Sequence, residues 1–227
     1  MDFPGLGDRL ASVRDRIGVH QARGGWHHPV RIIAVTKTHG PEAVRAALAA
    51  GLEDIGENRV QEALAKQDQL VGVPVRWHLI GSLQRNKARH AVGRFALIHS
   101  VDREDLAAEL DRRVPEGGSQ PVLVEVNCSG EPQKSGVDPG GLEPLLDRIA
   151  ALPRLRLDGL MTLAALSEDE GVQRAAFGRL RELRDRMRAA GHQLPELSMG
   201  MSGDFPMAVE EGATMVRLGT LLFGERQ

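Results

Sequence analysis

The chain has 227 residues, a formal net charge of -2 and a single cysteine, Cys128. This length suits one large α/β domain, and the balanced charge gives no support for a nucleic-acid partner. One cysteine excludes an internal disulfide, which suits a reducing cytoplasm, and the chain shows neither a signal peptide nor an apolar run of about 20 residues that would span a membrane.

The first part of the chain predicts one helix and then an alternation of strands and helices. Leu10, Val13 and Ile17 recur at spacings of three and four, which is typical of the apolar face of a helix over 7–22. In the break that follows, His27 and His28 have no partner at ligand spacing, so we predict no metal site there. The alternation then begins with a strand at 30–36, a helix at 41–50, a strand at 52–56, a helix at 59–70, a strand at 75–80 and a helix at 84–92.

The same alternation continues to the end of the chain. Asp102 is expected to cap a helix at its amino end. The predicted elements are a strand at 96–99, a helix at 103–113, a strand at 121–126, a loop at 127–138 with a helix up to 151, a strand at 155–161, a helix at 169–190, a strand at 197–200, a helix at 205–211 and a strand at 214–218.

Eight strands alternating with helices, in units of about 25 residues, favour a closed parallel (β/α)8 barrel of the TIM type. The alternative is an open doubly wound sheet, but no Gly-x-Gly-x-x-Gly follows the first strand. We predict a single domain over 1–227, with an extra N-terminal helix at about 7–22 and the barrel from about 30 to 227. The extra helix would replace a helix missing after the eighth strand.

Lys37 stands at the end of the first predicted strand, directly after an apolar run. Strand alternation places Ile33, Val35 and Lys37 on one face, and the functional groups of such barrels gather where strands end. The lysine has two interpretations. Its ammonium group can extend into water, or a desolvated neutral amine can attack a carbonyl and form a Schiff base.

Other strand ends carry polar residues with two interpretations each. Asn58 either caps a helix or holds a polar ring substituent, while Glu57 can pair with a nearby base. His78 is either a core residue of the third strand or a neighbour of a planar ligand. The loop at 127–136 is long enough to be functional, but Cys128 in it has no adjacent base, so we interpret the cysteine as structural.

The last two strand ends predict an anion site. Ser202 and the glycines beside it allow backbone N–H groups to approach an anion, and Gly219 and Thr220 add an N–H and a hydroxyl group. Loops after strands seven and eight form the common phosphate site of TIM barrels. Ordinary helix capping by Ser202 or Asp204 is the alternative.

Arg217 alternates onto the inner face of the eighth strand, where a charged guanidinium must have partners. A structural salt bridge is one interpretation, and a contact with a ring nitrogen is the other. A Schiff-base lysine, a phosphate site and an inner arginine together suggest pyridoxal 5′-phosphate (PLP). An arginine beside the pyridine nitrogen disfavours protonation of that nitrogen and so weakens the ring as an electron sink.

The chain resembles the PLP homeostasis proteins, which share a barrel with the amino-terminal domain of alanine racemase. The resemblance covers nearly the whole chain and rests on these stretches: 34–37 (AVTK), 56–62 (GENRVQE), 77–87 (WHLIGSLQRNK), 134–136 (KSG), 159–161 (GLM), 197–202 (LSMGMS), 216–220 (VRLGT) and 223–224 (FG).

The resemblance implies that Lys37 holds PLP as a Schiff base and that Arg217 contacts the ring nitrogen. The phosphate contacts that it implies are Ser202, Gly219 and Thr220, and the further lining residues are Asn58, His78, Ser198 and Met199. It also implies a monomeric cytoplasmic protein that stores, delivers or buffers PLP for PLP-dependent apo-enzymes, with effects on amino-acid metabolism and no catalytic turnover.

Two enzymatic alternatives compete with a PLP carrier. A PLP-dependent amino-acid racemase needs a second acid/base, which the alanine racemase kind takes from a tyrosine of a second domain, and this chain contains no tyrosine. Because His78 or Cys128 could substitute, weak racemase-like activity stays open. A class I aldolase, in which the lysine attacks a sugar phosphate directly, is disfavoured by Arg217 and the family motifs.

Overall fold

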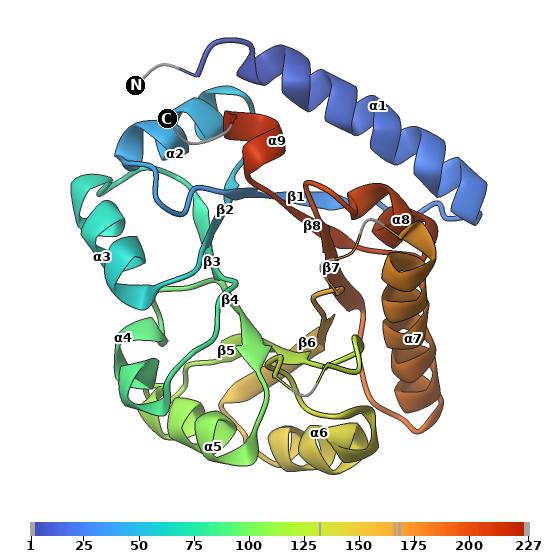
Figure 1. Ribbon diagram of the computed structural model, residues 1–227. Coiled ribbons are helices and arrows are strands. Elements are labelled where there is room, and N and C mark those ends of the chain that lie inside the picture. Colours follow the sequence, from blue (N-terminus) through green and yellow to red (C-terminus); the bar gives the residue numbers. More distant parts are fainter. Residues whose placement is uncertain (1–2, 132, 166, 168, 225–227) are drawn as a thin grey trace.

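A closed parallel barrel forms the centre of the molecule (Figure 1). The computed structural model describes residues 3–131, 133–165, 167 and 169–224. Within these ranges each strand pairs with its neighbours in chain order, and the eighth closes onto the first, as predicted for a (β/α)8 fold. The strands are β1 (Arg31–Val35), β2 (Asp54–Glu57), β3 (Arg76–Leu79), β4 (Leu97–Val101), β5 (Gln120–Glu125), β6 (Leu155–Met161), β7 (Glu196–Met201) and β8 (Met215–Leu218).

Helices surround the barrel on its outside (Figure 1). They are α1 (Leu6–Gly24), α2 (Pro41–Ala49), α3 (Val60–Gln69), α4 (Ala88–Ala91), α5 (Glu104–Arg113), α6 (Leu142–Ala150), α7 (Glu170–Ala189), α8 (Phe205–Glu210) and α9 (Thr220–Phe223), with 3-10 turns η1 (Arg85–Lys87) and η2 (Pro139–Gly141). None of the helices in the described ranges is long and apolar enough to cross a membrane. Pro132, in the predicted loop at 127–138, lies outside these ranges.

One local prediction is confirmed only in part, and another is wrong. The helix predicted at 84–92 is divided into the 3-10 turn η1 and the short helix α4. Of the residues in these two elements, only Ala88 and Ala91 are buried, so little apolar packing supports a longer α-helix. The Asp102 side chain does not cap α5, because the N-cap residue is Arg103. The Asp102 carboxylate instead forms an ion pair with the Arg103 guanidinium at 2.6 Å.

The amino-terminal helix α1 lies outside the ring, along α8 and α9 (Figure 1). Its apolar face buries Leu6 together with Leu10, Val13 and Ile17, the three residues whose spacing predicts the helix. Arg9 Nε donates a hydrogen bond to the Leu222 carbonyl at 2.8 Å. The element after β8, α9, is a single short turn, and α1 covers the side of the barrel beside it.

Strand alternation divides the apolar core into two layers. Residues on the outer faces of the strands pack against the helices, and those on the inner faces fill the barrel. The inner cluster contains Ile33, Leu97, Leu123, Met161 and Met215. At the carboxyl ends of the strands this inner packing gives way to a cavity.

Candidate functional site

Lys37 lies two residues beyond the end of β1, and its side chain is exposed. It lines a cavity of about 410 Å³ at the carboxyl ends of the strands. Ile33 of the same face packs inside the barrel, and Val35 lies on the cavity wall. The predicted face of this strand is therefore confirmed, and the amine stands at the mouth of the barrel.

The structure brings six of the nine residues predicted for the site to this cavity. They come from the ends of β1, β2, β7 and β8 and are Lys37, Asn58, Ser202, Arg217, Gly219 and Thr220. Residues at or just beyond the ends of β3, β5 and β6 also line the wall: Ile80, Gly81, Ser82, Glu125 and Leu163. Whether the six contact a ligand stays a prediction, but their convergence is a property of the fold.

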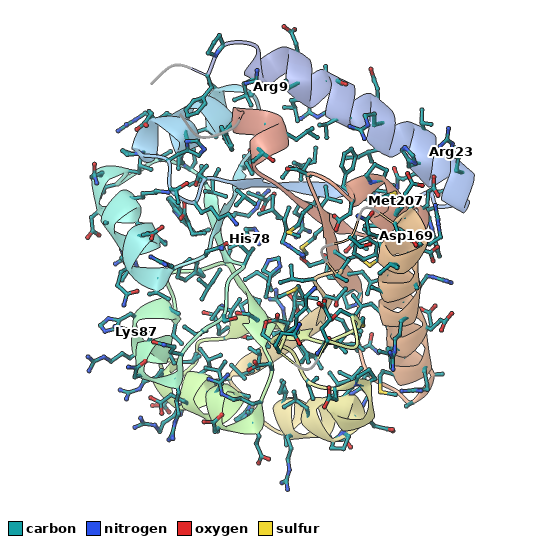
Figure 2. All side chains as sticks on the ribbon, viewed as in Figure 1. Arg9, Arg23, His78, Lys87, Asp169 and Met207 are labelled. Carbon is teal, nitrogen blue, oxygen red and sulfur yellow. The ribbon has the colours of Figure 1, made fainter. Side chains whose placement is uncertain are left out.

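Three predicted lining residues do not reach the cavity. His78 lies inside the ring of strands (Figure 2) and lines a different cavity, of about 400 Å³, with Asp54 and Arg76 from the beginnings of strands. Met199 is fully buried in the outer layer, because neighbours on a strand point to opposite faces and Ser198 points inward. Ser198 does not line the cavity itself, but it contacts Arg217, which does.

Arg217 is buried and reaches the cavity from β8. Two of its five N–H groups are used within the barrel: Nη1 donates to Ser198 Oγ at 2.7 Å and Nη2 to the Thr162 carbonyl at 2.9 Å. Burial lowers the pKa of Arg217 to about 10, although Asp204 and Glu125 oppose this shift. The guanidinium is therefore held in place and still cationic at neutral pH.

A chain of hydrogen bonds runs from Arg217 through the barrel to Asp54. Because a guanidinium only donates, Ser198 Oγ accepts from it and can donate its own proton to His99 Nδ1, 2.9 Å away. His99 Nε2 lies 3.0 Å from His78 Nδ1, and His78 Nε2 lies 2.9 Å from Asp54 Oδ1. With each histidine protonated on Nε2, every group donates in the same direction.

The two ends of this chain carry opposite charges. Burial by itself raises the pKa of Asp54, but hydrogen bonds from Arg76 and His78 outweigh it and hold the pKa well below its usual range. Burial, with the neighbouring His78 and Arg217, holds the pKa of His99 well below its ordinary value. His99 is therefore a neutral link between the Arg217 cation at one end and, at the other, the Asp54 carboxylate, which pairs with Arg76 at 2.7 Å.

The loops after β7 and β8 meet at Ser202. Its hydroxyl oxygen accepts hydrogen bonds from the Gly219 and Leu221 N–H groups, both at 3.3 Å. Asp204, the alternative capping residue, makes no side-chain cap to α8 and instead accepts from the Met201 N–H. Ser202, Gly219 and Thr220 all line the cavity, so two hydroxyl groups lie on its wall beside the first N–H groups of α9, which Ser202 already accepts from.

The polar residues after β2 have distinct roles. Asn58 does not cap α3, whose N-cap is Arg59 without a side-chain bond, so the capping interpretation is wrong and Asn58 lines the cavity instead. Glu57 pairs with a base, as the sequence suggested: Lys66 Nζ lies 2.5 Å from Glu57 Oε1.

Sequence reasoning missed Glu125. It is the last residue of β5 and lines the cavity, where it carries the only carboxyl group among the described wall residues. Ser135 Oγ donates to its Oε1 at 2.5 Å, and burial raises the pKa of the carboxyl group. A charged residue at an inward position of an apolar strand was the available signal, as it was for Arg217.

Comparisons with known proteins agree with this architecture. Residues 9–227 match the model of the family described as alanine racemase, N-terminal domain. The pyridoxal phosphate homeostasis protein of Aquifex aeolicus is 44% identical over 223 residues, which cover 97% of this chain and 98% of that protein.

The chain belongs to the pyridoxal phosphate homeostasis protein family.

Solved structures extend the comparison. PipY of Synechococcus elongatus, solved with PLP bound, has a TM-score of 0.84 and 41% identity, covering 96% of this chain and 100% of that one. An alanine racemase from Corynebacterium glutamicum has a TM-score of 0.72 and 20% identity. The match covers 100% of this chain and 62% of the racemase chain, and it shows that the two proteins share the barrel fold.

Proposed function

We propose that this family member binds PLP in the cavity at the carboxyl ends of the strands and serves intracellular PLP homeostasis, by storing, delivering or buffering the cofactor. The observation that carries the proposal is the convergence of the Lys37 amine, the Arg217 guanidinium and the loops at Ser202 and Thr220 on one cavity. Its volume, about 410 Å³, lies in the range of about 300–1,000 Å³ usual for small-molecule sites.

The wall residues fit the chemistry of PLP. Lys37 offers the amine for a Schiff base, and Arg217 offers N–H groups to the ring nitrogen. Ser202 and Thr220 offer hydroxyl groups to the phosphate, with Gly219, whose N–H group Ser202 Oγ accepts at 3.3 Å, beside them. Asn58 can hold a ring substituent. PLP supplies an aldehyde and an aromatic ring that carry the cofactor chemistry of the enzymes that use it. We propose that residues 1–227 act as one PLP-binding domain.

We propose a carrier rather than an enzyme. Racemisation requires a second acid/base beside the ligand, and the chain has no tyrosine. The two substitutes considered from the sequence are absent from the described wall: His78 lies toward the other end of the barrel, and burial raises the pKa of the Cys128 thiol to about 11. Glu125 is the titratable group that could support weak side activity.

The remaining parts of the proposal concern the cellular context. A single free cysteine, buried, suits a cytoplasmic protein. The apo-forms of PLP-dependent enzymes are the expected recipients of the cofactor, and the family resemblance suggests that the carrier acts as a monomer. Sedimentation of the purified protein with and without PLP tests the oligomeric state.

A spectral titration tests PLP binding. We expect PLP added to the purified protein to develop the absorbance of a Schiff base, and we expect Lys37→Ala to abolish it. Lys87→Ala is the matched control, because Lys87 lies outside the barrel on η1 (Figure 2) and should leave the spectrum unchanged. An identical spectrum in Lys37→Ala would refute the proposed site.

A second experiment separates carrier from enzyme. The loaded protein is incubated with each L-amino acid, and chirality and mass are followed against free PLP. We expect no steady turnover, and we expect faster reactivation of an apo-enzyme than simple release of PLP allows. Sustained racemisation above free PLP would favour the enzymatic alternative, and its loss in Glu125→Gln would identify the acid/base.

A further inference from the structure

The residue before Lys37 is held by an unusual number of contacts. Thr36 is fully buried, and its N–H group donates to the Gly56 carbonyl at 3.1 Å. Its carbonyl accepts from Lys66 Nζ at 2.6 Å and from the His39 N–H at 3.1 Å. Its hydroxyl group donates to Glu57 Oε1 at 2.5 Å. Every polar atom of Thr36 is therefore hydrogen-bonded.

Two of these contacts come from a buried ion pair. Lys66 is on the buried face of α3 with Val60 and Ala63, at a position where the helical pattern favours an apolar side chain. Glu57 is fully buried, and none of the described residues hydrogen-bonds its Oε2. Burial raises the pKa of Glu57, opposed by the hydrogen bonds from Lys66 and Thr36.

Stability alone is a weak reason for such a pair. Desolvation of two charges often exceeds their attraction, and an apolar pair of similar volume is commonly as stable or more so. The unpaired oxygen of Glu57 adds to that cost. A geometric role is the better explanation, because both charged groups converge on Thr36.

The consequence for Lys37 follows from its own surroundings. The Lys37 side chain is exposed, and no described residue forms a hydrogen bond or ion pair with its amine, so the reach of the amine depends on the backbone that carries it. On its other side Thr38 has φ 67, the one non-glycine residue of the described chain in the left-handed region. For a β-branched residue this conformation is unfavourable, and it persists only where the flanking structure is firmly held.

We propose that the buried Glu57–Lys66 ion pair is a positioning device for Lys37: by holding Thr36 at its hydroxyl and carbonyl groups, it fixes the backbone from which the amine reaches the cavity. The inference rests on the proposed Schiff base. In that step the neutral amine adds to the aldehyde carbon, one water leaves, and C=N replaces C=O. The pair also keeps the ammonium group of Lys66 bound to Glu57 and Thr36, so that this second lysine does not compete for the aldehyde.

The experiment compares PLP with pyridoxine 5′-phosphate, which has the ring and phosphate but an alcohol in place of the aldehyde. Only PLP can use Lys37 covalently, so the ratio of the two affinities reports the placement of the amine. The double variant Glu57→Leu/Lys66→Met replaces the pair with apolar side chains and keeps the site filled. We expect this ratio to fall by at least about tenfold, since misplacement of a reacting group carries penalties of this order.

The same variant should bind pyridoxine 5′-phosphate as the wild type does. Glu62→Gln is the matched control, because Glu62 is on the same helix but pairs with Arg59 at the surface, at 3.3 Å. It should leave both affinities unchanged. If the double variant weakens both ligands equally, or leaves the ratio unchanged, the inference is overturned.

Thr36→Val provides a second test in case the double variant does not fold. It keeps the shape of the side chain and the ion pair but removes the hydroxyl bond to Glu57, so we expect a smaller fall in the same ratio. An unchanged ratio in a folded Thr36→Val protein would also overturn the inference. A wild type with no preference for PLP would contradict the Schiff base itself, which distinguishes failure of the proposed function from failure of the positioning role.

Discussion

Ser198 is the link that joins Arg217 to the histidines inside the barrel, and its removal tests that chain. Ser198→Ala deletes the oxygen that accepts from Arg217 Nη1 at 2.7 Å and contacts His99 Nδ1 at 2.9 Å. All three side chains are buried, and His99, which lies away from the cavity wall, regains no hydrogen bond from bulk water. The substitution removes no apolar contact, which keeps its effect interpretable.

The magnitude follows from the two bonds. A hydrogen bond to a charged group contributes about 1.5–3 kcal/mol and a neutral one about 0.5–1.5 kcal/mol. We therefore expect the free energy of unfolding to fall by about 2–4 kcal/mol, which for a chain of this size lowers the Tm by about 4–16 °C. Thermal and urea unfolding of the ligand-free protein, followed by circular dichroism, measure both quantities.

Ser119→Ala is the matched control, because Ser119 is exposed and should leave the Tm unchanged. We also expect Ser198→Ala to weaken PLP binding, since Arg217 loses one of the contacts that orient it. A Tm within about 2 °C of the wild type would refute the reasoning, because it would mean that the chain of hydrogen bonds contributes nothing to the fold.

Three further predictions follow from single sites. A Cβ at Gly81 would lie 2.4 Å from the Asn58 carbonyl oxygen, so Gly81→Ala should lower the free energy of unfolding in urea by about 1–3 kcal/mol. Gly18 lies in the open middle of α1, and Gly18→Ala should raise the same free energy by about 0.5–1 kcal/mol. Equal effects of the two substitutions would contradict this reasoning. With its pKa at about 11, the Cys128 thiol should be ionised in about one molecule in a thousand at pH 8, and alkylation as fast as in the unfolded chain would contradict its burial. Because the pKa of Asp54 is depressed in the folded state, its stabilisation is complete above the unfolded pKa of about 4 and is lost as the pH falls below that value; acid titration of Asp54→Asn should show a shallower loss, and an unchanged slope would contradict it.

The parts of the site that the sequence predicted share a simple geometry. Lys37, Ser202 and Thr220 follow the ends of β1, β7 and β8, and the carboxyl ends of parallel strands meet at one face of a barrel. Alternation then assigned Arg217 to the inside. The order of strands and loops along the chain is enough to place these four residues, because none of their positions depends on which distant strand lies opposite.

The sequence does not predict how far along the barrel axis a side chain lies, or which residues of distant strands it contacts. Alternation shows that His78 points inward but not how far along the barrel axis it lies, and the structure places it beside Asp54, toward the beginnings of the strands. Its other partner, His99, reaches Ser198 across 99 positions of sequence. Such a contact depends on how the closed barrel brings non-adjacent strands together, which periodicity in one segment does not contain.

The buried ion pair shows the same division. The sequence indicates that Glu57 can pair with a base, but only the packing of α3 on the barrel identifies Lys66 as that base. The resemblance places Met199 in the cavity with Ser198, but neighbours on one strand cannot both point inward, and alternation alone separates the two residues.

The most direct test of the account is the location of the PLP adduct. The chain has four lysines, Lys37, Lys66, Lys87 and Lys134, so borohydride reduction of the PLP-loaded protein, followed by proteolysis and mass spectrometry of the peptides, assigns the adduct without ambiguity. The account predicts reduced PLP on Lys37 and none on the other three. Wild-type protein that carries the adduct on another lysine, or no adduct while still holding PLP, would contradict it.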